Sequence, residues 1–91
     1  MDYAEKLNGA LLIQEFVSEE FLKQGKAIQS FEWKPIIESM AQKHDLIIYI
    51  NGLPCIFKNI SRESIEDYPG KVGNENINAH VREWAKTAGN G

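Results

Sequence analysis

The chain has little of what covalent or metal chemistry usually requires. Cys55 is the single cysteine among 91 residues, so no disulfide can form within the chain and a reducing compartment is expected. The two histidines, His44 and His80, are far apart in sequence, and no CxxC or HxxxH spacing occurs. These absences exclude the common zinc motifs, and we predict that the chain binds no metal or other cofactor.

Long apolar runs are also absent. The longest are four residues, at 10–13, and five residues, at 46–50, whereas a membrane-spanning helix needs about 20. Residues 1–6 do not have the basic-then-apolar layout of a secretory signal. We therefore expect a soluble, cytoplasmic protein that does not contact a membrane.

Basic residues are too few and too scattered for a phosphate-binding surface. Ten Lys and Arg stand against 13 Asp and Glu, which gives a net charge of -3, and the basic residues are spread singly from Lys6 to Lys86. Proteins that hold nucleic acid through its phosphates usually show a basic excess or stripe. Nucleic acid is therefore not the expected partner.

What the sequence does contain is the composition of one globular domain and a strong β-hairpin signal. Hydrophobic residues make up 43% and charged residues 25%, so residues 1–91 predict a single domain. Runs rich in β-branched and aromatic side chains, about 45–50 and 53–59, flank Asn51-Gly52, the preferred dipeptide of a type I′ turn. The first run is apolar on both faces, which predicts a strand covered on both sides or central in its sheet. Pro54 indicates that the second strand has a free edge.

A long helix is predicted before the hairpin. Residues 2–5 resemble a capping box and Gly25 is a typical stop, so the helix is expected at about 3–24. Gly9 weakens this helix by about 1 kcal/mol relative to Ala, and a start at Asn8 is the alternative. At 100° per residue one stripe of the helix is apolar, namely Tyr3, Ala4, Leu7, Ala10, Leu11, Val17, Phe21 and Leu22.

Helical periodicity predicts a second helix directly before the hairpin. Pro35 suits the first turn of a helix at about 35–43, while residues 26–33 are either a short strand or an irregular segment. The apolar face of this helix would comprise Trp33, Ile36, Ile37, Met40, Ala41 and His44.

Two helices are expected after the hairpin. Ser61 can cap a short helix that ends at Tyr68, and Asn74 can cap a final helix at about 75–87, followed by a frayed tail at 88–91. The order α, (β), α, β, β, α, α predicts an α+β fold, with helices packed on a small antiparallel sheet built around the 45–59 hairpin. The final helix has an apolar stripe of Ile77, Val81, Trp84 and Ala85.

The residues that remain as candidates for chemistry have simpler structural interpretations. His44 ends a predicted helix, where the dipole stabilises a protonated histidine, and Cys55 lies within an apolar strand, which is typical of a buried thiol. Residues 69–74 precede a helix but do not have the spacing of a phosphate-binding loop. We therefore predict no catalytic residue and no enzymatic activity.

Residues 45–61 resemble the nuclease hairpin in the motor subunits of type I restriction enzymes. Asp45 opens the first strand and Asn51-Gly52-Leu-Pro matches the turn. In that family a Glu-x-Lys follows on the next strand, and the acidic residues bind Mg²⁺ while the Lys helps to activate water. Asn59 and Ser61 stand at the Glu and Lys positions, so the resemblance implies a hairpin without two of its three catalytic groups. Glu38 could supply a further carboxylate.

The leading functional hypothesis is a small acidic, non-enzymatic protein-binding regulator, inhibitor or adaptor of the kind that phages and mobile elements encode. Leu12 and Phe16 project from the predicted polar side of the first helix, beside Glu19 and Lys23, and exposed apolar patches often mark protein contacts. These four residues are the candidate interface with a partner or with a second copy in a homodimer. The alternative for Leu12 and Phe16 is burial within the domain.

Two other functions are possible. One is a catalytically degenerate nuclease-like module that binds DNA or a restriction complex. The other is a small-molecule binder that stacks a ligand on Trp33, Tyr49 or Trp84, although nothing in the sequence indicates a small-molecule ligand and these aromatic residues are more often core.

Overall fold

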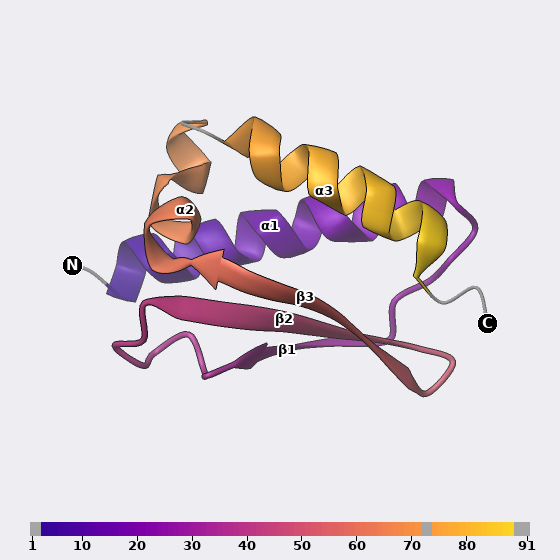
Figure 1. Ribbon diagram of the computed structural model, residues 1–91, viewed down its shortest axis with the longest axis horizontal. Helices are drawn as coiled ribbons and strands as arrows, with labels where there is room; N and C mark the ends of the chain where they lie inside the picture. The colour runs from indigo at the N-terminus through magenta and orange to yellow at the C-terminus, as the bar shows by residue number, and fades with distance from the viewer. Residues whose placement is uncertain (1–2, 72–73, 89–91) are drawn as a thin grey trace.

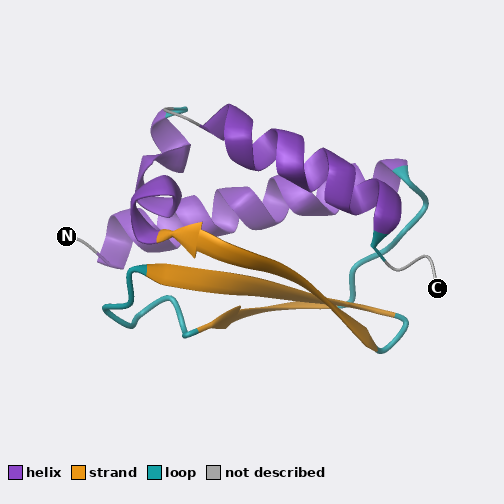
Figure 2. Cartoon of the chain, viewed as in Figure 1, coloured by secondary structure: helices purple, strands orange, loops and turns teal. Residues whose placement is uncertain are grey.

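A computed structural model describes residues 3–71 and 74–88 and confirms the α+β fold. Three antiparallel strands form a sheet in the order β1-β2-β3, and the helices form a layer beside it (Figures 1 and 2). The elements are α1 (Tyr3–Lys23), β1 (Ser30–Lys34), β2 (Lys43–Ile50), β3 (Leu53–Ser61), α2 (Arg62–Asp67), the 3-10 helix η1 (Tyr68–Gly70) and α3 (Asn74–Thr87).

The hairpin is formed as predicted, and its strands are longer than expected. Asn51 and Gly52 have φ angles of 53° and 79°, as both central residues of a type I′ turn require. β2 is the central strand, which explains why both of its faces are apolar. β3 is an edge strand, as Pro54 indicates, and β1, in the segment whose conformation the sequence left open, is the other edge.

The core lies between the sheet and the helices. Side chains alternate between the two faces of a strand, so Leu46 and Ile48 point to the same side of β2, and both are fully buried. Trp33 and Phe57 are the register partners of Leu46 on the two neighbouring strands. One continuous row across the three strands therefore faces the helices.

α1 ends as predicted but buries a different face. Gly25 has a φ of 74°, and the amides of Gly25 and Lys26 donate to the carbonyls of Leu22 and Phe21, which together form a Schellman motif. The predicted stripe is partly wrong, because Leu11 and Leu22 are 52% and 62% exposed. The buried face instead comprises Lys6, Gly9, Ala10, Ile13, Val17, Glu20 and Phe21.

Gly9 is explained by the crossing of α1 and α2. A Cβ at Gly9 would overlap the backbone carbonyl of Ile65 on α2. α1 begins at Tyr3, so the alternative start at Asn8 is wrong, and the helix passes through Gly9. The glycine that costs local helix stability therefore permits the close contact between the two helices.

The predicted helix at 35–43 is wrong, because residues 35–42 form the loop between β1 and β2. Lys34 and Asp45 are register partners, and paired residues in an antiparallel sheet lie about 5 Å apart. A nine-residue helix would separate its ends by about 13 Å and could not join them. Ile36 and Met40, expected on an apolar face, are 63% and 77% exposed.

The segments after the hairpin follow the predictions. Ser61 caps α2 by accepting a hydrogen bond from the Ser64 amide at 3.0 Å, and α3 buries Ile77, Val81 and Ala85. Ala88 is half-buried, and its amide donates to the carbonyl of Trp84. The rest of the predicted tail, and Asp2 of the predicted capping box, lie outside the described residues.

Candidate functional site

A groove between β3 and α3 is the candidate functional site. It consists of two adjoining cavities, of about 340 and 230 Å³, which share Phe57, Lys58 and His80. We call it the β3–α3 groove; it is lined by Ile56, Phe57, Lys58, Asn59, Ile60, Ser61, Ser64, Asn76, Ile77, His80 and Trp84.

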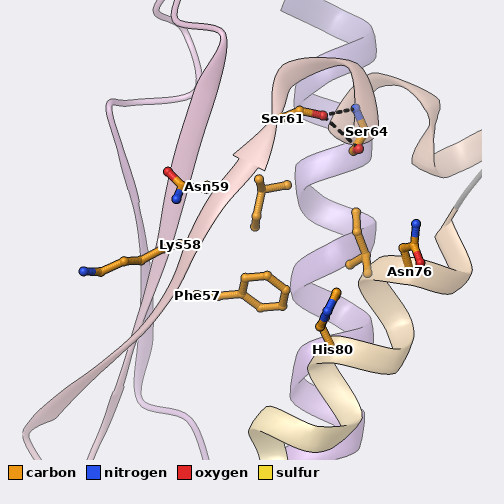
Figure 3. Close-up of a pocket in the computed structure, with 9 residues that line it drawn as sticks. Phe57, Lys58, Asn59, Ser61, Ser64, Asn76 and His80 are labelled. Carbon is orange, nitrogen blue, oxygen red and sulfur yellow. Dashed lines mark hydrogen bonds between the residues drawn. The ribbon is translucent and has the colours of Figure 1, made fainter.

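Aromatic side chains set the distance between the two walls of the groove. Phe57 points from β3 toward α3, where its ring meets His80 edge-to-face at 6.4 Å between centroids (Figure 3). The Phe57 ring also meets Trp84 at 5.3 Å, and Trp84 in turn meets Phe21 of α1 at 5.0 Å. These edge-to-face contacts are favourable for π-systems, so they hold α3 at a fixed distance from β3.

Polar groups line the rim of the larger cavity. The Ser61 hydroxyl donates to the Ser64 hydroxyl at 2.8 Å, and both lie at one end, while Asn76 and His80 lie on the α3 side (Figure 3). Ile60 and Ile77, which line the same cavity, are buried. The groove therefore has an apolar interior with hydroxyl, amide and imidazole groups around it.

The free edge of β3 runs along this groove. A two-residue turn makes Ile50 and Leu53 a hydrogen-bonded pair, and pairing alternates from there along an antiparallel ladder. The backbone groups of Cys55 therefore bond to β2, while those of Pro54 and Ile56 point to the free edge. Proline has no amide N–H, and it is tolerated at this edge because an outward N–H there would have no partner in the sheet.

A β-bulge ends the regular edge. The register between β2 and β3 shifts between His44 and Leu46, and Asn59 has a φ of 63°. The Asn59 amide donates to Asp45 Oδ1 at 2.9 Å instead of to a strand carbonyl. The regular part of the edge is therefore short, from Pro54 to about Lys58.

Charge in the groove differs from that of the whole chain. The chain carries 13 acidic residues, but none of the residues that line the two cavities is acidic. Lys58 is exposed, and its side chain points away from the cavity (Figure 3). No carboxylate among the described residues pairs with its ammonium group.

Of the four residues predicted as an interface, two are half-buried and two are exposed. Leu12 and Phe16 are half-buried and pack against the core, and the Arg82 guanidinium lies 5.4 Å from the centre of the Phe16 ring. Glu19 and Lys23 are exposed, and Lys23 pairs with Glu20 at 3.0 Å. Their role in binding remains a prediction.

The residues at the positions that resemble the nuclease hairpin make structural contacts in this chain. Asp45 accepts the bulge amide, and the Ser61 hydroxyl caps α2. Glu38 lies in the loop between β1 and β2. Among the residues that the structure describes, no group of three or more His, Cys, Asp and Glu side chains could hold a metal ion. The nuclease-like alternative remains a prediction.

A second polar cluster holds the loop at 35–42 against the helices. The buried Lys6 ammonium donates to the Ser39 carbonyl at 2.6 Å, and His44 Nδ1 lies 2.8 Å from the Pro35 carbonyl. Burial lowers the pKa of both Lys6 and His44. Because a carbonyl only accepts, Nδ1 carries the proton in the neutral ring, and His44 Nε2 is left buried without a hydrogen-bond partner among the described residues.

Beside this loop lies another groove, with a volume of about 280 Å³. We call it the α1–β1 groove; it is lined by Leu7, Ala10, Gln14, Glu32, Trp33, Ile36, Ile37 and Glu38. Its polar groups already bond to one another or to the protein: the Trp33 indole donates to Gln14 at 2.7 Å, and the Tyr49 hydroxyl donates to Glu32 at 3.1 Å.

No protein family, curated protein sequence or solved structure matches this chain. No helix in residues 3–71 and 74–88 is long and apolar enough to cross a membrane. Sequence reasoning identified the free edge of β3 through Pro54 but missed the groove, because the facing residues Asn76 and His80 are distant in sequence. Both lie beside the predicted apolar stripe of the final helix, and that position is the sequence feature from which the groove could have been predicted.

Proposed function

We propose that this protein is a non-enzymatic binding module that takes an extended segment of a partner protein along the free edge of β3. The observation that carries the proposal is the coincidence of an unpaired strand edge with an apolar groove beside it. Peptides that add a strand to a sheet gain affinity from main-chain hydrogen bonds and specificity from pockets for alternate side chains. The backbone at Pro54 and Ile56 and the two cavities supply both elements.

The rival surface on α1 is less suited to this role. Leu12 and Phe16 are part of the packing around the core, so a partner that required both side chains would have to rearrange the contact between Phe16 and Arg82. The β3 edge requires no rearrangement, since its outward backbone groups have no partner strand among the described residues. A regulator, inhibitor or adaptor could use this edge to bind a short unstructured segment of its target.

The test starts from peptides selected on the wild-type protein from a random 12-residue display library. Binding of each synthetic peptide is measured by fluorescence anisotropy and mapped by amide chemical shifts. Shifts concentrated at residues 55–58 and 76–84 support the proposal. Shifts concentrated on α1 around Leu12 and Phe16, or a selection that yields no binding peptide, would overturn it.

Two substitutions of one residue separate the backbone from the side chain. Ile56→Pro removes the outward amide at a position where an edge strand tolerates proline, whereas Ile56→Ala keeps the amide and shortens the side chain. We expect Ile56→Pro to weaken peptide binding at least tenfold, which corresponds to the loss of about one hydrogen bond. Ile56→Ala should bind within about threefold of wild type. Equal losses for the two variants would contradict strand addition.

A further inference from the structure

The geometry points to a specific pattern in the partner segment: two apolar residues separated by one acidic residue, bound with the acidic side chain against Lys58. This inference rests on the proposed function, because it concerns the same edge. It follows from the alternation of side chains in a strand, the positions of the two cavities and the direction of Lys58.

The two cavities define the apolar positions. They adjoin at Phe57, one extending toward Ile77 and the other toward Trp84. In an added strand, residues i and i+2 point to the same face and lie about 7 Å apart. Two alternate side chains of the partner that face the helix layer would therefore enter the two cavities, one in each.

Lys58 defines the position between them. It follows Phe57 in β3, so its side chain lies on the opposite face, and Figure 3 shows it pointing away from the cavity. The middle residue of the partner segment points to that same outer face. Opposite charges on neighbouring strands attract, and like charges directly opposite repel. An acidic middle residue therefore fits beside Lys58, and a basic one does not.

The surroundings support this assignment of charge. The acidic middle residue points to the outer face, where the Asp45 carboxylate lies opposite the bulge and already accepts the Asn59 amide. The Lys58 ammonium has no carboxylate partner among the described residues, whereas Lys23 and Arg62 are each paired with a Glu on their own helix. A guest carboxylate would therefore not have to displace an existing ion pair of Lys58.

The experiment uses three labelled peptides that differ at one position. Each has the sequence acetyl-Gly-Ser-Thr-Leu-X-Leu-Thr-Ser-Gly-amide, with X as Glu, Gln or Lys. We expect the Glu peptide to bind about two- to fivefold more tightly than the Gln peptide, and the Lys peptide to bind most weakly. Lys58→Gln should remove the preference for Glu over Gln, and Lys58→Glu should make the Lys peptide the tightest binder. Lys34→Gln, which removes one positive charge from the other edge strand, should leave the wild-type order unchanged.

The outcomes separate this inference from the proposed function. Equal affinities for the three peptides, with amide shifts at residues 55–58, would overturn the charge pattern and leave strand addition in place. A preference for Glu that survives Lys58→Gln would also overturn it. If none of the three peptides binds at millimolar concentration while peptides from the random library bind at the edge, the pattern of alternate leucines is wrong. If no peptide of either kind binds, strand addition fails as well.

Discussion

The two grooves that flank the sheet differ in what their polar groups do. In the α1–β1 groove, the indole of Trp33 and the carboxylate of Glu32 bond to Gln14 and Tyr49, and the neighbouring loop is held by Lys6. In the β3–α3 groove, the backbone of Ile56 and the ammonium of Lys58 have no such partner among the described residues. Hydrogen bonds within the protein help to fix the α1–β1 side, whereas an exposed strand edge without a neighbouring strand can pair with another chain.

The two grooves also differ in the interactions that hold their walls in place. The α1–β1 side is held by two hydrogen bonds between side chains and by one from Lys6 to a loop carbonyl, and such bonds depend on direction. On the other side, α3 is held by its buried apolar face, by ring contacts, and by hydrogen bonds from Tyr68 to Asn78 and from Lys26 to the end of the helix. Four substitutions test this comparison.

The largest effect is expected at Gly9, where α1 meets α2. Gly9→Ala places a methyl group on the Ile65 carbonyl, so α2, which carries Ser64 of the β3–α3 groove, must move. We expect a loss of about 3 kcal/mol or more in the free energy of unfolding, measured with urea. Asn8→Ala, at the exposed neighbouring position, is the control and should change stability by less than about 0.5 kcal/mol. Wild-type stability of Gly9→Ala would show that the helices do not cross this closely.

The next largest effect is expected at Lys6, which supports the α1–β1 side. Lys6→Met keeps an unbranched side chain, one atom shorter, but removes the charged hydrogen bond to the Ser39 carbonyl. A loss of about 2 kcal/mol is expected, together with faster hydrogen exchange in residues 35–42. Lys58→Met removes an equal charge from an exposed position without an ion pair and should change neither quantity. Unchanged exchange in Lys6→Met would show that the loop is held by something else.

A smaller effect is expected at Lys26, which supports the β3–α3 side. Its ammonium donates to the carbonyls of Ala85 and Ala88, at 2.7 and 2.8 Å, at the end of α3. Lys26→Met should cost about 1 kcal/mol and shift the amide resonances of α3 around His80 and Trp84. The resonances of residues 35–42 should stay in place, since that loop is held independently. Shifts in both regions would contradict the separation of the two sides.

The smallest effect is a pH dependence at His44. Burial lowers its pKa in the folded protein below the ordinary value, so the unfolded chain binds the proton more readily. Stability is therefore constant above the unfolded pKa, about 6.5, and falls as the pH decreases from there toward the folded pKa. One proton limits the slope to about 1.4 kcal/mol per pH unit. Urea unfolding at pH 7.5, 6.5 and 5.5 should show stability falling with pH in wild type and falling less steeply in His44→Asn.

These features differ in how far the sequence predicts them. The turn at Asn51-Gly52, the stop at Gly25 and the cap at Ser61 were predictable, because each depends on the backbone of a few neighbouring residues. The loop at 35–42 was mistaken for a helix, because Ile36, Ile37 and Met40 have helical spacing while the adjoining strands decide the conformation. The pairing of the two adjoining strands cannot be read from the spacing of apolar residues within the loop.

The candidate site is likewise predictable from the sequence only in part. Pro54 predicted the free edge, since proline is confined to such positions. The groove itself depends on the packing of α3 beside β3, and the reason for Gly9 depends on a carbonyl 56 residues later in the chain, on another helix. The burial of Lys6 and His44 was missed for a similar reason: their partners are carbonyls of a loop that sequence reasoning assigned to a helix.

The edge of β3 also has to avoid aggregation. An exposed strand edge can pair with the same edge of another molecule and propagate into fibres. In an antiparallel self-pair centred on Lys58, the two ammonium groups would lie directly opposite each other, and Pro54 offers no donor. The bulge at Asn59 further shortens the template. The lysine that would select an acidic guest would therefore also keep copies of the protein apart in a crowded cell.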